Sequence, residues 1–282
     1  MEKSKCKTKV AALLMVLVIV FIPFGSVFAA PARGVVQTSG FGVESGPRTY
    51  NYGGTYYIQE NSADHFLTGE ITNYRSGFDL QLTVRNYETD RTLRRVKEHI
   101  TPPSNMKSID LLDLCNPSTK LGQNMLCSKE LVAAMDLRTL PVGYYQFDFS
   151  INDTAAVSGR CIYVKVCSRS SIYFVEDTYS TLGYPHSDIM GYYAYELSKK
   201  NLSATNFVWL LYCNNPFDLN KHVPRTAAIK ICRLCFLGTV SGSELFSYIQ
   251  YATQNGNGSL LHKILYSDRC KSAFRSKGFM AG

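Results

Sequence analysis

The clearest pattern in the chain is a strict alternation of apolar and polar residues that begins after a Leu-Pro-Val-Gly turn at positions 140–143. A period of two residues predicts a half-buried antiparallel strand. A second alternating run at positions 78–85 offers it a partner face. The apolar positions are Tyr145, Phe147, Phe149 and Ile151 in the first run, and Phe78, Leu80, Leu82 and Val84 in the second.

Further short runs with strand character, separated by turn residues, lie between positions 55 and 168. Six or seven short strands over about a hundred residues are typical of an all-β sandwich. Within this region we expect residues 113–136 to form an insertion with one or two helical turns near 129–135. Residues 30–54 are rich in Gly, Ser, Thr and Tyr, and we interpret them as a flexible leader.

Beyond position 186 the apolar residues recur with a helical period. Ser203, Ser241 and Ser267 each precede such a segment, and serine is a preferred helix N-cap. We therefore predict an all-α helical bundle at 187–282, joined to the sandwich by a linker at 169–186. The expected fold class is a multidomain chain, with an N-terminal immunoglobulin-like β-sandwich and a C-terminal helical bundle.

Residues 1–29 have the composition of a secretory signal peptide. Four lysines precede an apolar stretch at 10–22 that is short for a membrane span, and small residues follow it. An uncleaved N-terminal anchor is the alternative interpretation. Both place the rest of the chain outside the cytoplasm, secreted or at the cell surface.

The net charge falls from +8 (30 minus 22) to +5 (26 minus 21) when the four lysines and Glu2 of this segment are removed. The remaining charge is modest and spread out. No basic run with interleaved aromatic residues suggests nucleic-acid binding. A weakly basic exported protein fits an environment of anionic envelope polymers, or simply a solubilising surface.

Eight cysteines follow Cys6, which leaves with the signal segment. An even number in an oxidising compartment suggests disulfides. Cys161 and Cys167 would lie about 20 Å apart on one straight strand and cannot bond each other. They would pair with Cys115 and Cys127 of the predicted insertion, or stay free. The candidates are Cys115, Cys127, Cys161, Cys167, Cys213, Cys232, Cys235 and Cys270.

The Cys-x-x-Cys at 232–235 lies inside a predicted helix, without the strand or the intervening proline or glycine of a thiol-redox motif. Zinc held by this pair with Cys213, Cys270, His222 or His262 is chemically possible. We favour disulfides or buried thiols and expect no metal and no cofactor.

The sandwich region resembles the immunoglobulin-like accessory modules found beside Gram-positive cell-wall amidases and other secreted enzymes. The resemblance covers residues 55–166 and depends on the Leu-Pro-x-Gly-x-Tyr segment of Leu140, Pro141, Gly143 and Tyr145. The cysteine-bearing insertion departs from it. The resemblance implies a sandwich that supports binding rather than catalysis.

The C-terminal region resembles a small helical domain of unknown function that is common in bacterial exported and surface proteins. The resemblance covers residues 207–274. Thr239 and Ile249 stand where that family has Arg and Trp. It implies a bacterial, exported context and no particular chemistry. The residues that carry it are Ile231, Leu234, Leu237, Gly238, Gly242, Leu245, Tyr248, Gly256, Ile264, Leu265, Ser267 and Phe274.

No catalytic motif is visible. The chain lacks a Gly-x-Ser-x-Gly elbow, a His-Glu-x-x-His zinc motif and a glycine-rich phosphate loop after a strand. The nearest approach to paired carboxylates is Asp110 with Asp113 and Glu176 with Asp177, and nothing in the sequence sets either pair across a cleft.

Nineteen tyrosines against one tryptophan is the remaining oddity. Exposed tyrosines bind sugars and protein partners at low entropic cost, although strand propensity and core packing also explain such clusters. The candidate ligand-binding residues are Tyr50, Tyr52, Tyr56, Tyr57, Tyr192, Tyr193 and Tyr195.

The sequence thus favours a non-catalytic binding or scaffolding protein of the bacterial cell envelope, with a cell-wall glycan or an envelope protein as partner. The alternatives are an exported enzyme or zinc-dependent factor built on the C-terminal cysteines, and a host-facing adhesin or effector. All of them need an exported, stable chain.

Overall fold

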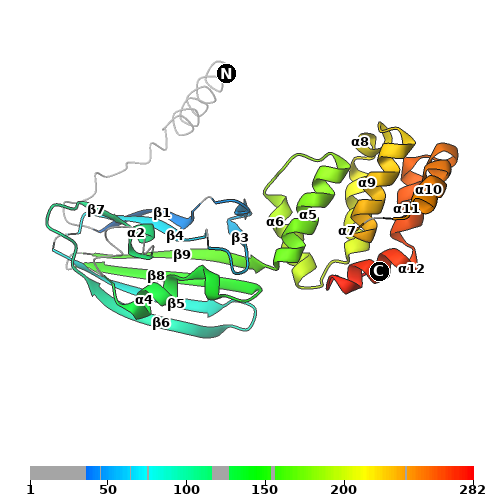
Figure 1. Ribbon diagram of the computed structural model, residues 1–282. Coiled ribbons are helices and arrows are strands. Elements are labelled where there is room, and N and C mark those ends of the chain that lie inside the picture. Colours follow the sequence, from blue (N-terminus) through cyan, green and yellow to red (C-terminus); the bar gives the residue numbers. More distant parts are fainter. Residues whose placement is uncertain are drawn as a thin grey trace, which may run out of the picture.

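The computed structural model describes residues 36–282, except positions 45, 64, 75, 116–126, 154–155 and 239. The proposed signal segment lies outside this part of the chain. Figure 1 shows two lobes side by side: a sheet lobe of residues 36–167 and a helical lobe of residues 168–282, with strand β9 leading directly into helix α5.

The sheet lobe contains two sheets. The first has three antiparallel strands in the order β1-β4-β7, and the second has six in the order β2-β3-β9-β8-β5-β6. The strands are β1 (Gln37–Val43), β2 (Tyr50–Tyr52), β3 (Thr55–Gln59), β4 (Leu67–Thr72), β5 (Phe78–Asn86), β6 (Arg91–Ile100), β7 (Ser108–Asp110), β8 (Gly143–Asp153) and β9 (Ala156–Cys167).

The predicted pairing of the two alternating runs is confirmed. Strands β5 and β8 are antiparallel neighbours, with Leu82 opposite Phe149 and Val84 opposite Phe147. The apolar side chains of both strands point into one buried core. Phe41 of β1 crosses to Phe149 edge to face, with ring centroids 5.3 Å apart, so the small sheet closes over the large one.

The Leu-Pro-x-Gly-x-Tyr segment has a clear physical role at the start of β8. The Tyr145 hydroxyl donates a hydrogen bond to the Pro141 carbonyl at 2.8 Å. A β-carbon on Gly143 would lie 2.9 Å from that hydroxyl. Glycine at this position therefore leaves room for the ring to fold back and fix the entry of the strand.

The helical lobe contains eight helices along the described chain. They are α5 (Arg169–Leu182), α6 (Ile189–Ser198), α7 (Ala204–Asn214), α8 (Phe217–Asn220), α9 (Pro224–Phe236), α10 (Gly242–Asn255), α11 (Asn257–Leu265) and α12 (Asp268–Ser276). The side chains of Ser203, Ser241 and Ser267 each accept a backbone N–H in the first turn of the following helix, which confirms the three predicted caps.

The predicted fold class is wrong, because the structure is mixed α and β: two sheets with accompanying helices form the N-terminal part, and helices follow. The sheet lobe carries helices α2 (Leu111–Cys115) and α4 (Lys129–Met135) and the 3-10 turn η1 (Leu137–Thr139), and its strand β3 runs parallel to β9. The core of the helical lobe includes Tyr50 and Tyr57 of the sheet and Cys167 of β9. An all-β immunoglobulin-like sandwich followed by an all-α bundle therefore does not describe this chain.

Two boundaries also differ from the expectation. Strands β1 and β2 lie within the predicted leader, 30–54. Helix α5 occupies most of the predicted linker, 169–186, with Ser168 as its N-cap. Its many serines, threonines and tyrosines hid an apolar stripe of buried residues: Ile172, Phe174, Val175, Tyr179 and Leu182. The division into two independent domains stays a prediction.

Candidate functional site

The two tyrosine groups singled out in the sequence meet where the lobes join. Tyr50 and Tyr57, on β2 and β3, and Tyr195, on α6, are each at least nine-tenths buried. The Tyr57 and Tyr195 rings pack edge to face, with centroids 6.4 Å apart. Helix α6 can approach because Gly191 faces this pair: a β-carbon there would lie 2.6 Å from that of Tyr57.

A lysine sits among the aromatic rings of this junction. The Lys165 ammonium lies 4.6 Å from the Tyr195 ring centroid and 4.8 Å from that of Tyr144. The Tyr195 hydroxyl donates to a Glu88 oxygen at 2.5 Å, and Lys199 donates to the other at 2.8 Å. Cation–π contacts and charge-assisted hydrogen bonds between side chains therefore connect the two lobes.

The Glu88 contacts predict a pH dependence. Burial tends to raise the pKa of Glu88, but the hydrogen bonds from Lys199 and Tyr195 outweigh it and the pKa is lowered. Because the folded pKa lies below the unfolded value of about 4.3, this stabilisation is complete above that value and is lost as the pH falls through the folded pKa. The free energy of unfolding of Glu88→Gln should therefore approach that of the wild type below about pH 4. A constant difference from pH 3 to 7 in denaturant titrations would contradict this prediction.

The other candidate tyrosines do not gather into one surface. Tyr52 and Tyr192 are partly exposed neighbours, with ring centroids 6.2 Å apart. The Tyr193 ring packs on Phe207, and Tyr56 lies against Gly42. Among the seven candidate tyrosines, Tyr52 and Tyr192 are the most exposed, and ligand binding there stays a prediction.

The described cysteines show no disulfide geometry. Cys161, Cys167, Cys213, Cys232, Cys235 and Cys270 carry free thiols, Cys127 is buried, and the side chain of Cys115 lies outside the described part of the chain. Burial raises the pKa of the Cys161 and Cys232 thiols to about 11. In Cys235 a hydrogen bond with Cys270, together with burial, raises the thiol pKa. Protonated, buried thiols are poor nucleophiles and poor metal ligands.

Within the described residues no three histidines, cysteines or carboxylates gather in the manner of a metal site. The paired carboxylates seen in the sequence also have structural partners. Glu176 accepts hydrogen bonds from Arg48 at 3.0 Å and from the Tyr50 hydroxyl at 3.1 Å, and Asp177 lies 3.9 Å from Arg233. Asp110 accepts from backbone and side-chain groups of β4 and α2.

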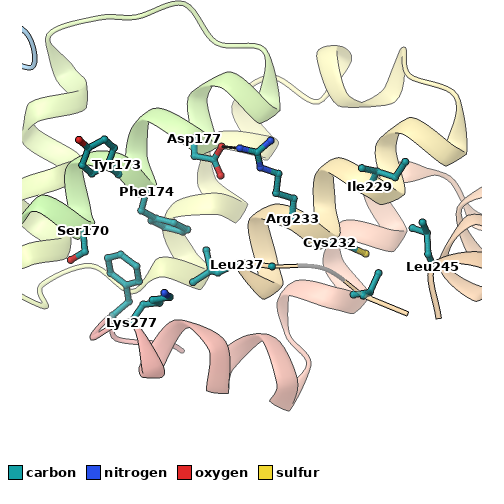
Figure 2. Close-up of a pocket in the computed structure, with 13 residues that line it drawn as sticks. Ser170, Tyr173, Phe174, Asp177, Ile229, Cys232, Arg233, Leu237, Leu245 and Lys277 are labelled. Carbon is teal, nitrogen blue, oxygen red and sulfur yellow. Dashed lines mark ion pairs between the residues drawn. The ribbon is translucent and has the colours of Figure 1, made fainter. Parts of the chain in front are cut away.

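One of the hollows on the helical lobe is an apolar groove of about 830 Å³. One wall is α5, the other is α9 with the turn into α10, and the C-terminal end closes one side (Figure 2). We call it the α5–α9 groove. Its apolar lining consists of Tyr173, Phe174, Ile229, Leu237, Val240, Leu245 and Phe279, together with the buried Cys232.

The groove has a charged rim. Figure 2 shows Asp177 and Arg233 joined across it, with Lys277 at the other edge. The Arg48 guanidinium lies over the Tyr173 ring at 4.4 Å, and that of Arg169 at 5.5 Å. Basic groups therefore outnumber acidic ones around the apolar floor.

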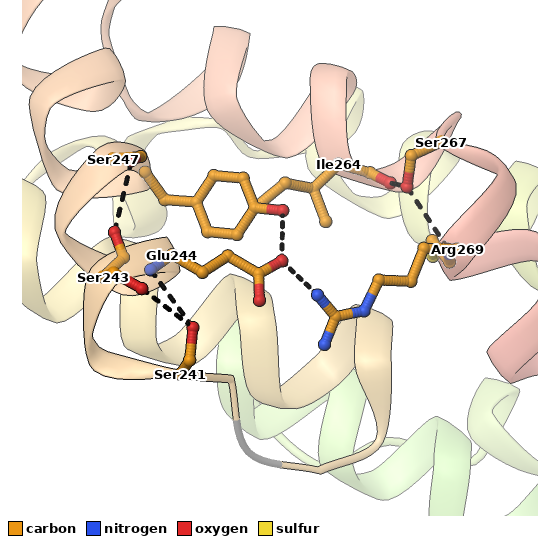
Figure 3. A network of polar contacts seen from close by, with 9 residues as sticks. Ser241, Ser243, Glu244, Ser247, Ile264, Ser267 and Arg269 are labelled. Atoms are coloured by element: carbon orange, nitrogen blue, oxygen red, sulfur yellow. Dashed lines mark hydrogen bonds and ion pairs between the residues drawn. The ribbon is translucent and has the colours of Figure 1, made fainter.

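The α10 wall of the groove is held by a polar network (Figure 3). Glu244 accepts hydrogen bonds from the Tyr248 hydroxyl at 2.9 Å and from Arg269 of α12. The Arg269 guanidinium also lies 4.3 Å from the Phe236 ring centroid. These contacts fix α10 against α9 and α12, so Leu245 and Val240 are held facing the groove.

This groove was not predicted from the sequence, because one of its walls, α5, lies in the segment that we took for a linker. The period of three and four residues through Ile172, Val175 and Tyr179 was the available signal. Leu237, which ends α9 and lines the groove, takes a left-handed backbone with φ 52° although it is not a glycine.

No helix in the described part of the chain has the length and apolar character needed to cross a membrane. No protein-family model and no curated protein sequence matches this chain. The two resemblances noted in the sequence therefore stay predictions.

Proposed function

We propose that this chain is a non-catalytic binding protein of the bacterial cell envelope, and that its α5–α9 groove holds an apolar segment of a protein partner. The observation that carries the proposal is the groove itself. It has an apolar floor and a volume of about 830 Å³, it is open to solvent, and charged side chains lie along its rim. Hollows of this kind and size are the usual binding sites of proteins. The envelope location rests on the signal segment of the sequence.

The groove walls favour a helical occupant. Two roughly facing helices with aliphatic and aromatic side chains form the surface on which an amphipathic helix buries its apolar face. Arg233 is paired with Asp177, and Lys277 and Arg169 add basic charge at the rim, so the fitting segment carries acidic residues beside its apolar face. The raised thiol pKa of Cys232 supports a binding role over a chemical one.

A direct test uses a peptide of about 15 residues with Leu at i, i+3, i+4 and i+7, flanked by Glu, against the same peptide flanked by Lys. Calorimetry with the full chain should show tighter binding of the Glu peptide. Equal affinity for both peptides, or binding of a small apolar dye with no peptide binding, would count against the proposal.

Substitutions in the groove should locate the binding. Leu245→Asp places a charge on the apolar floor and should weaken binding of the Glu peptide at least ~10-fold, which corresponds to about 1.4 kcal/mol. Phe246→Asp is the matched control, because Phe246 is the next residue of α10, 60% exposed and outside the groove.

A second variant protects this test against misfolding. Ile229 lines the groove and is 46% exposed, so Ile229→Asp should lose affinity without loss of the fold. If Leu245→Asp, Ile229→Asp and Phe246→Asp all bind alike, the groove is not the binding site.

A further inference from the structure

A second hollow of about 860 Å³ lies on the helical lobe and has a different chemistry. It is formed by α7, the turn between α8 and α9, and the junction of α10 with α11. We call it the Trp209 cleft. Most of its lining is polar, and it shares no residue with the α5–α9 groove.

Aromatic rings form one wall of this cleft. The half-buried rings of Trp209 and Tyr212 are tilted by 30° with centroids 5.3 Å apart, and His262 packs edge to face on Trp209 at 5.0 Å. His262 is exposed, and the Tyr266 ring lies 4.7 Å from it and 6.3 Å from Trp209 between centroids. A wall of this kind offers flat apolar surface beside polar ring atoms.

Amide groups also line the cleft, and one of them ties its elements together. Buried Asn257 donates to the backbone carbonyls of Leu219 at 3.1 Å and His222 at 2.9 Å, which ties the start of α11 to the turn before α9. Asn220 donates to the Tyr212 hydroxyl at 3.2 Å. Asn255 is exposed at the rim, where its amide nitrogen donates to the Tyr251 carbonyl at 3.1 Å and its amide oxygen can accept from a ligand.

Two glycines keep the cleft open. A β-carbon on Gly258 would lie 1.9 Å from the Tyr212 hydroxyl, so the tyrosine occupies its observed place only above a glycine. Gly256 has φ +88° and no atom within 4 Å of a β-carbon position. Its left-handed backbone turns the chain between α10 and α11 and leaves the space beside Asn255 free.

The charges of the cleft are already engaged. The Lys263 ammonium lies 4.0 Å from the Tyr251 ring centroid, and Lys230 contacts the His222 ring nitrogen at 3.0 Å. Burial and the neighbouring Lys230 lower the pKa of His222, so its ring is neutral at pH 7. None of the described residues lining the cleft is a carboxylate. The cleft therefore presents neutral donors and acceptors next to aromatic faces, with the one ammonium of its described lining, Lys263, held on the Tyr251 ring.

We propose that the Trp209 cleft is a binding site for a neutral oligosaccharide, separate from the peptide groove. The C–H faces of a pyranose ring stack on aromatic rings, and its hydroxyls pair with amide and imidazole groups. Trp209, Tyr212 and His262 supply the stacking surface, and Asn220, Asn255 and His222 supply the polar contacts. This inference does not depend on the proposed peptide binding, since the two hollows share no residue.

The single tryptophan of the chain makes the test direct, because all tryptophan emission comes from this cleft. The full chain is titrated with N-acetylated chitotriose, cellotriose and mannotriose, and with a galacturonate trimer as the acidic counterpart. At least one neutral trisaccharide should change the emission saturably, with a dissociation constant of about 1 mM or below. The absence of any saturable change, or a response to the acidic trimer alone, would overturn the proposal.

Variants show whether the cleft is responsible. His262→Ala and Asn255→Ala change exposed side chains and should each weaken the best trisaccharide at least tenfold. Leu210→Ala is the control, since Leu210 is adjacent to Trp209, 43% exposed and outside the cleft. Trp209→Ala, followed by calorimetry, should abolish binding. If Trp209→Ala does not fold, the affinities of His262→Ala and Asn255→Ala still test the site. An equal loss of trisaccharide affinity in Leu210→Ala would contradict binding in the Trp209 cleft.

Discussion

Phe147→Ala should lower the free energy of unfolding by about 3–5 kcal/mol, the usual loss for a fully buried phenylalanine. The Phe147 side chain has no exposed surface and lies between Val84 of β5 and Ile162 of β9, its register partners on the two neighbouring strands. The central position in the six-stranded sheet prevents collapse of the strands into the space left behind. Denaturant titration with unchanged slope would measure the loss.

The control for this change is one residue away. Gln146 points to the other face of β8, is partly exposed and contacts Asp148 at 2.7 Å. Gln146→Ala should change the free energy of unfolding by about 0.5 kcal/mol or less. Similar losses for Phe147→Ala and Gln146→Ala would show that the alternation does not separate core from surface in this strand.

Gly191→Val should be the second large effect, with a loss of about 2–3 kcal/mol from overpacking. A β-carbon at this position would lie 2.6 Å from that of Tyr57 and 2.8 Å from that of Tyr50, and both belong to strands that cannot shift independently. The added side chain must therefore push α6 away from β2 and β3. Denaturant titration measures the loss, and limited proteolysis between the lobes should become faster.

Gly242→Val is the matched control, because this helical glycine has no atom within 4 Å of a β-carbon position. Valine is a better helix residue than glycine, so the variant should be neutral or slightly more stable. If Gly191→Val is as stable as Gly242→Val, the close approach of α6 to the sheet lobe does not contribute to stability.

The two proposed sites give the helical lobe two ligand classes. The α5–α9 groove is apolar with a basic rim, and the Trp209 cleft is polar and aromatic without carboxylates in its described lining. A protein that holds a partner segment in one and an oligosaccharide in the other would connect a protein to a glycan. Such a connection is the scaffolding role that the sequence predicts, and the two proposed sites name the residues that would carry it.

The tyrosine clusters show why the sequence alone could not separate binding residues from buried ones. Tyrosine serves equally well on a binding surface and inside a joint between lobes. Gly191 lets α6 approach the sheet lobe closely, and Glu88 accepts a hydrogen bond from Tyr195. These two contacts bury Tyr50, Tyr57 and Tyr195 at the junction of the lobes. That pairing depends on contacts between residues more than a hundred positions apart.

The sequence by itself determined the local elements. The alternation at 143–153, the apolar partner strand at 78–86 and the serine caps of α7, α10 and α12 follow from side-chain period and hydrogen-bonding chemistry within a few residues. The helical turns predicted near 129–135 are confirmed as α4. The tertiary structure decided the rest: the parallel pairing of β3 with β9 and the sharing of one core between lobes. These features, like both hollows, arise from contacts between distant segments, and no local pattern encodes such contacts.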